Sequence, residues 1–487
     1  MNEDRSVNDP VDEAIARLID RRRFLQIAAG GAAVIAVSVI EACSPAATAA
    51  PTAPATPAPA TPGAATPNAT LAATSGPVIT PVASSAATGR TIKIGYVSPK
   101  TGPLAGFAEA DDFIIAGAQK AFGAGLTVGG TTYPIQIITQ DTQSDSARAA
   151  SVAGDLITND QIDVMLVAST PDTTNPVADQ CEANGVPCIS TVAPWQPYFF
   201  GRQKDPANPV PFTWTYHFFW GLEDIISVFL DMWSQVSVAK KVGGIFPNDP
   251  DGNAWGDAKN GFPPAFAAAG YTLTDPGRYG NGTPTSDFSA QIGAFKTAGD
   301  EIITGVPIPP DFTTFYTQAI QQGFRPKVAS VGKALLFPSS VEALGDKGDG
   351  LSCEVWWSPE HPFTSSLTGQ TAQALADEYT TTTTKQWTQP IGFGHALFEV
   401  LADVLKRTTN VDDKSAFITA MKATKLNTVV GPLDWTVGKP FPNIAKTPLV
   451  GGQWGKGTDH PYELTIVSNK DHPEIPKLGN LRLIPGA

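Results

Sequence analysis

The chain has 487 residues, 33 Lys and Arg against 46 Asp and Glu, and a formal net charge of −13. We expect no nucleic-acid partner, because nucleic-acid binding needs a basic footprint that this acidic chain lacks. A hydrophobic fraction of 42% is typical of a globular protein. About 400 residues after the N-terminal region exceed one ordinary core, so two lobes are expected.

Segment 1–43 has the order of an export signal. Arg21–Arg23 precede an apolar run from Ile27 to Ile40, and Ala42 and Cys43 follow it. The run is shorter than the ~20 apolar residues that cross a bilayer. The segment resembles a twin-arginine signal ending in a bacterial lipobox, which implies a lipid-modified Cys43 at the start of the mature chain. The alternative is an ordinary apolar N-terminal helix.

Segment 44–90 consists almost entirely of Ala, Pro, Thr, Ser and Gly. It has no aromatic residue and no apolar periodicity, so it cannot bury enough surface to offset its ordering entropy. We predict a disordered tether between the membrane anchor and the folded part.

From residue 91, predicted strands and helices alternate in two series. Such alternation predicts an α/β fold with two similar lobes, each a doubly wound parallel sheet whose ligands bind beyond the carboxyl ends of the strands. The predicted strands are 91–97, 133–139, 164–167, 187–191, 242–246 and 301–306, and the predicted helices are 113–121, 146–158, 176–183, 263–269, 289–298 and 313–322.

Four signposts occur in a familiar order: Thr101–Phe107, Asp141 with Ser144–Ser146, Asp287–Ile292 and Val429–Trp435. Together they resemble the Leu/Ile/Val-type solute-binding proteins of bacterial ABC importers. The resemblance implies a type I periplasmic-binding fold with a three-segment hinge, in which two lobes close on a ligand. It places lobe one at 91–213 and 355–434, and lobe two at 214–354 and 435–487. It also implies a monomer and a membrane permease that recognises the closed form.

The loop Ser169–Asn175 leaves a strand and enters a helix, where free backbone N–H groups and hydroxyls favour a carboxylate. By the resemblance, Ser169, Thr173 and Thr174 hold the ligand's carboxylate, although Thr173 could instead only cap its own helix. The loop after the next strand implies further ligand contacts at Thr191, Ala193 and Trp195.

Aromatic residues on both lobes are candidates for a clamp that excludes water. Phe107 and Trp255 match aromatic positions of the family, and Trp220 stands near the first crossing. The alternative for each is an ordinary core position. Trp356 and Trp357 are assigned to hinge packing.

Lys333 stands where amino-acid binders of the family keep a carboxylate for the ligand's ammonium. A cation there would repel an α-ammonium, which favours a ligand with a carboxylate and no amine, or an amide. The alternative is that Lys333 extends to the surface. Asp311 and Glu354 are spare acids that could restore amino-acid binding.

Cys181 and Cys188 could form a local disulfide outside the cytoplasm, or could be buried free thiols. No histidine stands at ligand spacing from them, so no metal site is expected. The five scattered histidines form no catalytic motif, and no phosphate loop occurs, so we expect no enzyme and no cofactor. The predicted function is the extracytoplasmic, membrane-anchored solute-binding component of an ABC importer. A lipid-tethered ligand sensor and an extracytoplasmic hydrolase are the alternatives.

Overall fold

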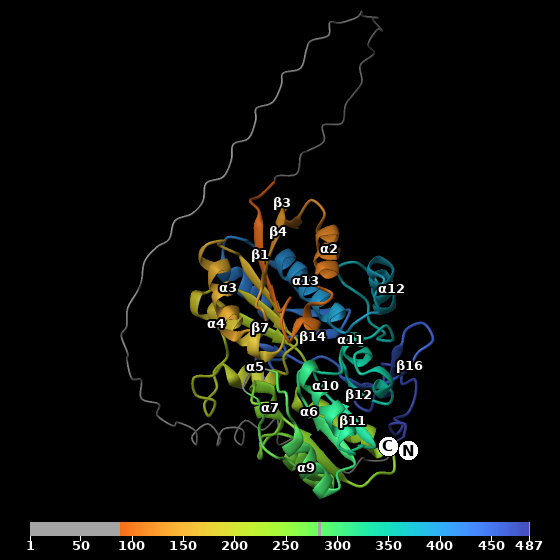
Figure 1. Cartoon of the computed structure of the whole chain (residues 1–487). Helices are drawn as coiled ribbons and strands as arrows, with labels where there is room; N and C mark the ends of the chain where they lie inside the picture. Colours follow the sequence, from red (N-terminus) through yellow and green to blue (C-terminus); the bar gives the residue numbers. More distant parts are fainter. Residues whose placement is uncertain (1–87, 281–283, 487) are drawn as a thin grey trace, which may run out of the picture. The chain divides into compact units, whose positions relative to one another are not determined.

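The computed structural model describes residues 88–280 and 284–486 (Figure 1). The predicted signal, Cys43 and residues 44–87 of the predicted tether lie outside the described residues. No helix within the described residues has both the length and the apolarity needed to cross a membrane.

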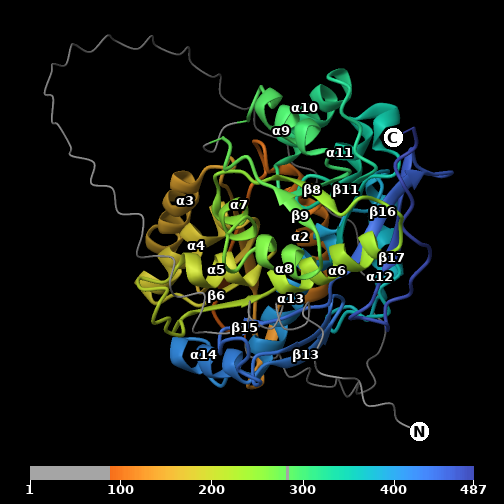
Figure 2. The ribbon, with the colours of Figure 1, turned by 90° about the horizontal axis from the view of Figure 1, so that it is seen from below.

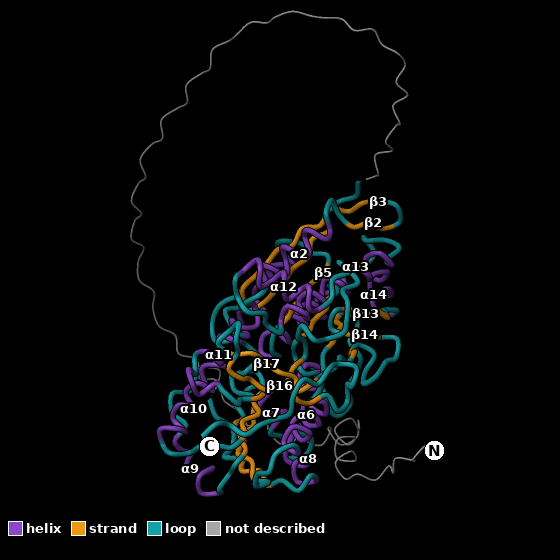
Figure 3. The backbone as a smooth tube through the Cα atoms, turned by 90° about the vertical axis from the view of Figure 1, so that its right-hand side faces the viewer, coloured by secondary structure: helices purple, strands orange, loops and turns teal. Residues whose placement is uncertain are grey.

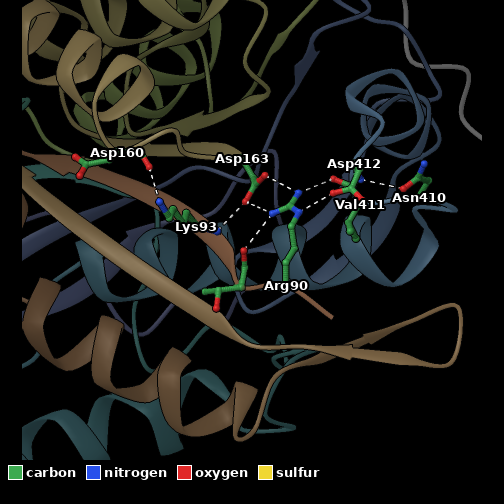
Figure 4. A network of polar contacts seen from close by, with 8 residues as sticks. Arg90, Lys93, Asp160, Asp163, Asn410, Val411 and Asp412 are labelled. Atoms are coloured by element: carbon green, nitrogen blue, oxygen red, sulfur yellow. Dashed lines mark hydrogen bonds and ion pairs between the residues drawn. The ribbon is translucent and has the colours of Figure 1, made fainter. Parts of the chain in front are cut away.

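The folded part begins before the predicted end of the tether at residue 90. The Gly89 backbone N–H donates to the Thr132 carbonyl at 2.8 Å. The Arg90 guanidinium forms two parallel hydrogen bonds of 2.8 Å with Asp163 and a third of 2.6 Å with Asp412 (Figure 4). This paired geometry fixes the chain at Arg90 against two distant segments.

The first sheet has six strands, all parallel, in the order β15-β7-β6-β5-β1-β4. Its strands are β1 (Ile92–Ser98), β4 (Ile135–Asp141), β5 (Val164–Ala168), β6 (Cys188–Thr191), β7 (Thr215–Phe218) and β15 (Ile444–Ala445).

Helices cover both faces of this sheet because its strands alternate apolar side chains between two cores. Ile94 and Tyr96 pack with residues of α2 and α13, whereas Val97 packs with residues of α3 and α4 on the other side (Figure 1). The helices of this lobe are α2 (Asp111–Phe122), α3 (Ser146–Thr158), α4 (Pro171–Asn184), α5 (Trp195–Gly201), α12 (Ala372–Thr383), α13 (Pro390–Arg407) and α14 (Lys414–Lys422). Two hairpins, β2 (Leu126–Val128) with β3 (Thr131–Tyr133) and β13 (Lys425–Thr428) with β14 (Gly431–Asp434), complete it.

The second sheet has the order β17-β16-β12-β11-β10-β8-β9. Five strands are parallel: β8 (Lys241–Ile245), β9 (Thr272–Thr274), β10 (Ile302–Gly305), β11 (Val328–Val331) and β12 (Ser352–Val355). The sheet continues antiparallel through β16 (Val450–Lys456) and β17 (Tyr462–Ser468), which run side by side in Figure 3. The predicted parallel α/β lobes are therefore confirmed, with an antiparallel extension that the sequence did not indicate.

Helices also pack on the second sheet, and α6 contacts its antiparallel edge (Figure 2). They are α6 (Leu222–Ser234), α7 (Pro250–Trp255), α8 (Phe262–Ala268), α9 (Ser289–Ala298), α10 (Pro309–Gln321) and α11 (Pro338–Glu342), with 3₁₀ turns η2 (Ala105–Ala108) in the first lobe and η3 (Gly345–Gly348) in the second.

Within the described residues, the chain passes between the two sheets three times, as the predicted hinge requires. The first passage follows β7, the second follows β12, and the third separates β15 from β16. Residues 215–218 and 444–445 were assigned to lobe two, but they pair in the first sheet, so the first and third boundaries lie later than predicted. We use lobe one for the part built on the first sheet and lobe two for the part built on the second.

Candidate functional site

A cavity lies between the lobes at the carboxyl ends of the parallel strands. The space between its atoms is about 300 Å³, part of it open to solvent. Loops that follow six strands supply most of its lining, which is the usual ligand position in open α/β sheets. The lining residues are Phe107, Thr170, Val192, Pro194, Phe219, Trp220, Asp251, Trp255, Val306, Lys333, Leu336, Glu354 and Trp356.

Aromatic side chains from both lobes and from the crossings form much of the wall. Of the predicted aromatic residues, Phe107, Trp220 and Trp255 all line the cavity. Phe219 and Trp356 also line it, with ring centroids 5.2 Å apart in an edge-to-face contact. Phe219 was not predicted to contact a ligand, and Trp356 was predicted to pack in the hinge. The strands that end just before these two residues, β7 and β12, were not predicted from the sequence.

Lys333 is buried in the cavity wall, with 3% of its side chain exposed. Its Nζ lies 2.9 Å from Asp249 Oδ2 and 2.9 Å from Asp251 Oδ2. Burial alone would lower the pKa of Lys333, but Asp249 and Asp251 raise it above its usual value. The alternative of a surface lysine is therefore wrong. Two carboxylates neutralise its charge, so the expected repulsion of an α-ammonium by Lys333 loses its basis.

Carboxyl groups outnumber this ammonium. Glu354 is 2% exposed, and its Oε1 accepts a hydrogen bond from the Lys333 backbone N–H at 3.2 Å. Burial raises the pKa of Glu354 to about 8, that of Asp251 to about 6 and that of Asp172, from lobe one, to about 7. Glu354 Oε2 and Asp251 Oδ1 have no hydrogen-bond partner among the described residues. Acceptors that are buried and unbonded commonly mark a ligand position.

The hydroxyl-bearing residues predicted for lobe one lie behind the cavity lining. Thr174 Oγ1 donates to the Ser169 carbonyl at 2.8 Å, and Thr191 Oγ1 donates to the Phe218 carbonyl at 2.6 Å. Thr173 Oγ1 and Ser169 Oγ are buried without a partner among the described residues. Neighbours of these residues, Thr170, Val192 and Pro194, reach the cavity instead. A role of the four hydroxyls in ligand binding stays a prediction.

Ala193 and Trp195 also belong to a bonded layer behind the lining. The Ala193 carbonyl lies 2.7 Å from His217 Nε2, and Trp195 Nε1 donates to Glu223 Oε1 at 3.1 Å. The His217 ring stacks on Tyr198 with centroids 3.9 Å apart. Burial lowers the pKa of His217 to about 3, so this imidazole is neutral and its Nε2–H donates to Ala193.

A second lysine cluster, only partly buried, lies where the first and third crossings meet. Lys446 Nζ is 2.7 Å from Glu223 Oε1 and 2.7 Å from Asp224 Oδ1. Glu223 also accepts from Gln196 Nε2, and Asp224 Oδ2 accepts from the Gly221 backbone N–H at 2.8 Å. This cluster bonds the start of α6 to the third crossing.

Cys181 and Cys188 are buried free thiols in the structure, and no disulfide joins them. The second of the two alternatives is therefore the one observed. Burial raises the pKa of the Cys181 thiol, and the neighbouring Cys188 raises it further.

Comparison with known families places this architecture. The family model described as Periplasmic binding protein matches residues 91–456. The chain belongs to the periplasmic binding protein family. The match ends before β17. Beyond it, this periplasmic binding protein still packs on lobe two as far as Ile484, whose backbone N–H donates to the Lys327 carbonyl at 2.9 Å.

Solved structures similar to this periplasmic binding protein share its fold. A leucine-binding protein, LivK, from Thermotoga maritima is 19% identical with a TM-score of 0.63, over 78% of this chain and 99% of that one. LivJ from Streptococcus pneumoniae, in complex with isoleucine, is 17% identical with a TM-score of 0.60, over 78% and 99%. A solute-binding protein of an ABC transporter from Rhodopseudomonas palustris, in complex with 3,4-dihydroxybenzoic acid, is 18% identical with a TM-score of 0.61, over 81% and 99%. No curated protein sequence matches the chain.

Proposed function

We propose that this periplasmic binding protein is the solute-binding component of an ABC importer. It captures a small molecule between its lobes outside the cytoplasm and delivers it to a membrane permease. The lipid on Cys43 and the segment that follows keep the protein near that permease.

The observation that carries this proposal is the cavity at the strand ends. Phe107 and Thr170 come from lobe one, whereas Trp255, Lys333 and Glu354 come from lobe two. A molecule held there contacts both lobes, so its binding energy favours their closed arrangement. The permease can then distinguish loaded from unloaded protein by the arrangement of the lobes.

The ligand classes to test are amino acids, amides and small carboxylates. The similar structures from S. pneumoniae and R. palustris contain isoleucine and 3,4-dihydroxybenzoic acid. The neutralised Lys333 no longer favours an anion over an amine in this chain, so all three classes belong in the panel.

Thermal unfolding of the purified chain with each compound tests the proposal. A ligand at 100 times its Kd should stabilise the protein by ~2.7 kcal/mol, and calorimetry should give one site per chain. Failure of every compound to stabilise the protein, or chemical turnover of a bound compound, would contradict the proposed function.

A further inference from the structure

The charges that line the cavity are unbalanced toward the negative. Among the described lining residues, Lys333 is the one base, and its ammonium is already shared between Asp249 and Asp251 at 2.9 Å each. Glu354 stands beside this group, and Asp172 approaches it from lobe one. One cation therefore faces four carboxyl groups, which a further positive charge would stabilise.

Two of these carboxyl groups belong to residues that line the cavity, and each has an oxygen that is buried and unbonded. Glu354 and Asp251 both line it, each is 2% exposed, and each has one oxygen without a hydrogen-bond partner. A buried acceptor of this kind lacks a donor that a bound molecule can supply. The Asp311 carboxyl, in contrast, accepts from the Thr285 backbone N–H at 2.7 Å and lines a separate groove.

The aromatic wall meets this acidic group directly. Gly332 has no side chain, and a Cβ there would lie 2.5 Å from Trp255 Cη2 and 3.2 Å from Glu354 Oε1. The indole edge and the carboxylate therefore approach the same backbone position. Trp220, Trp356, Phe107 and Phe219 complete the wall. Aromatic faces attract cations, and such cages commonly bind quaternary ammonium groups.

Three of the residues that were candidates to hold a carboxylate, Thr174, Thr191 and Lys333, have no free side-chain donor for it. The Thr174 and Thr191 hydroxyls donate to backbone carbonyls inside lobe one, and Lys333 is already paired. Trp220 and Trp356 line the cavity, and their indole N–H groups have no partner among the described residues, so each remains a donor for an acceptor group of a ligand.

We propose that the ligand is a small organic ammonium ion with a hydroxyl or carbonyl group, held by Glu354, Asp251 and the aromatic wall. This inference rests on the proposed capture function. The ammonium donates to Glu354 Oε2 or, when quaternary, lies against the rings beside it. Its charge also offsets the repulsion between Asp172 of lobe one and the carboxylates of lobe two as the lobes close.

Matched probes test the charge. Choline and 3,3-dimethyl-1-butanol have the same shape, but only choline is charged. Likewise 3-methylbutylamine carries an ammonium where 4-methylpentanoate carries a carboxylate. We expect at least one ammonium compound to raise the melting temperature of the purified chain and to bind at least tenfold more tightly than its matched partner. Equal or tighter binding of the neutral or anionic partner, or no binding by either ammonium compound, would overturn the inference. The proposed function fails only if its wider panel fails as well.

The variant Glu354→Gln assigns the recognition to one side chain. The amide keeps an acceptor for the Lys333 N–H but cannot ionise beside a cation, so affinity for the ammonium compound should fall at least tenfold while affinity for its neutral partner stays the same. Glu399→Gln is the matched control, because Glu399 is also buried, at 1% exposed, but is bonded to the Ser366 and Val429 N–H groups in lobe one. Equal effects of the two variants on ammonium binding would overturn the assignment.

A measurement on the unaltered chain keeps the inference testable if Glu354→Gln does not fold. At pH 7 Glu354 is largely protonated, and a cation beside it favours its ionised form. Titration calorimetry in two buffers of different ionisation enthalpy should therefore show proton release when the ammonium compound binds. Proton uptake would contradict a cation at this carboxyl group, and so would the absence of proton exchange at a pH where the stability of the protein shows Glu354 to be protonated.

Discussion

The two lysine clusters of the described chain contain similar charges but differ in how fully their atoms are bonded. In the cluster at the crossings, Lys446 contacts two carboxylates, and each of the four carboxylate oxygens has a partner. In the cavity cluster, Lys333 also contacts two carboxylates, but one oxygen of Asp251 has none. In the cluster at the crossings, Glu223 is bonded to Lys446, Trp195 and Gln196, and Asp224 is bonded to Lys446 and the Gly221 N–H.

This difference separates a structural role from a binding role. A fully bonded buried network fixes one local arrangement, since any change leaves a charged group without a partner. A network with open acceptors can be completed by a molecule from solution. The same residue types therefore hold the hinge in one place and are available to a ligand in the other.

The largest expected effect comes from Lys333→Met. The substitution leaves Asp249 and Asp251 buried without a cation, so we expect a loss of ~3–5 kcal/mol in the free energy of unfolding at pH 7. The loss should shrink toward pH 5 as Asp251, whose pKa burial raises to about 6, accepts a proton. Urea unfolding at both pH values measures it.

A surface lysine supplies the control for this variant. Lys327 is paired with Glu301 at 2.7 Å, but 39% of its side chain is exposed. Lys327→Met should change stability little, because exposed ion pairs contribute little. A loss below about 1 kcal/mol for Lys333→Met at pH 7 would show that the cavity cluster is not a buried ion network.

The next effect is the pH dependence that Glu354 adds to stability. Burial raises its pKa from a usual value of 4.5 to about 8, so the folded protein binds this proton more tightly than the unfolded chain does. The stability that this bound proton gives the folded protein is therefore fully present below pH 4.5 and is lost as the pH rises toward 8. Between pH 5 and pH 8 the decline should be about 3.5 kcal/mol, since each pH unit over which only the folded protein holds this proton costs ~1.4 kcal/mol.

Glu354→Gln cannot lose this proton, so its stability should fall less between pH 5 and pH 8.5. Thermal or urea unfolding of both proteins over this range measures the difference. Burial raises the pKa of Asp111 and of Glu399 to about 7. Both residues contribute equally to the two proteins, so their effect cancels in the comparison. Parallel stability curves would mean that Glu354 is ionised in the folded protein.

Local patterns in the sequence predicted much of the fold. The predicted helices 146–158 and 289–298 coincide with α3 and α9, where apolar spacing and end residues agree, and Asp145 accepts from the Arg148 N–H at 2.7 Å as a helix cap. Strands β7 and β12 were missed because they are four residues long and contain His217 and Glu354. These polar residues interrupt the apolar pattern, and the first predicted lobe boundary falls before β7 instead of after it.

The candidate site was predictable only in part. Phe107, Trp220, Trp255 and Lys333 all line the cavity. The sequence could not show that Lys333 pairs with Asp249, because the two lie 84 residues apart and meet only when β8 and β11 enter one sheet. Charge compensation depends on tertiary contacts, so an inference about ligand charge drawn from one lysine was unsafe.

Lys446→Met should have a smaller effect than Lys333→Met. Glu223 keeps the Trp195 and Gln196 donors, and 34% of the Lys446 side chain is exposed, so we expect a loss of ~2 kcal/mol. Because this cluster has no unbonded acceptor, the variant should prefer choline over 3,3-dimethyl-1-butanol as strongly as the unaltered protein does. Melting curves with and without each compound measure both properties. A lost preference at unchanged stability would assign a binding role to the hinge cluster.

Thr191→Val should have the smallest effect, and it separates the sequence-based site from the observed cavity. The hydroxyl donates to the Phe218 carbonyl across the paired strands β6 and β7. Valine keeps the shape but leaves that carbonyl with one bond fewer, so we expect a loss of ~1 kcal/mol in stability. If the cavity lining is as observed, ligand affinity should not change, since this hydroxyl is behind Val192. A tenfold loss of affinity with unchanged stability would instead support the resemblance, because the hydroxyl would then have to turn from Phe218 to the ligand.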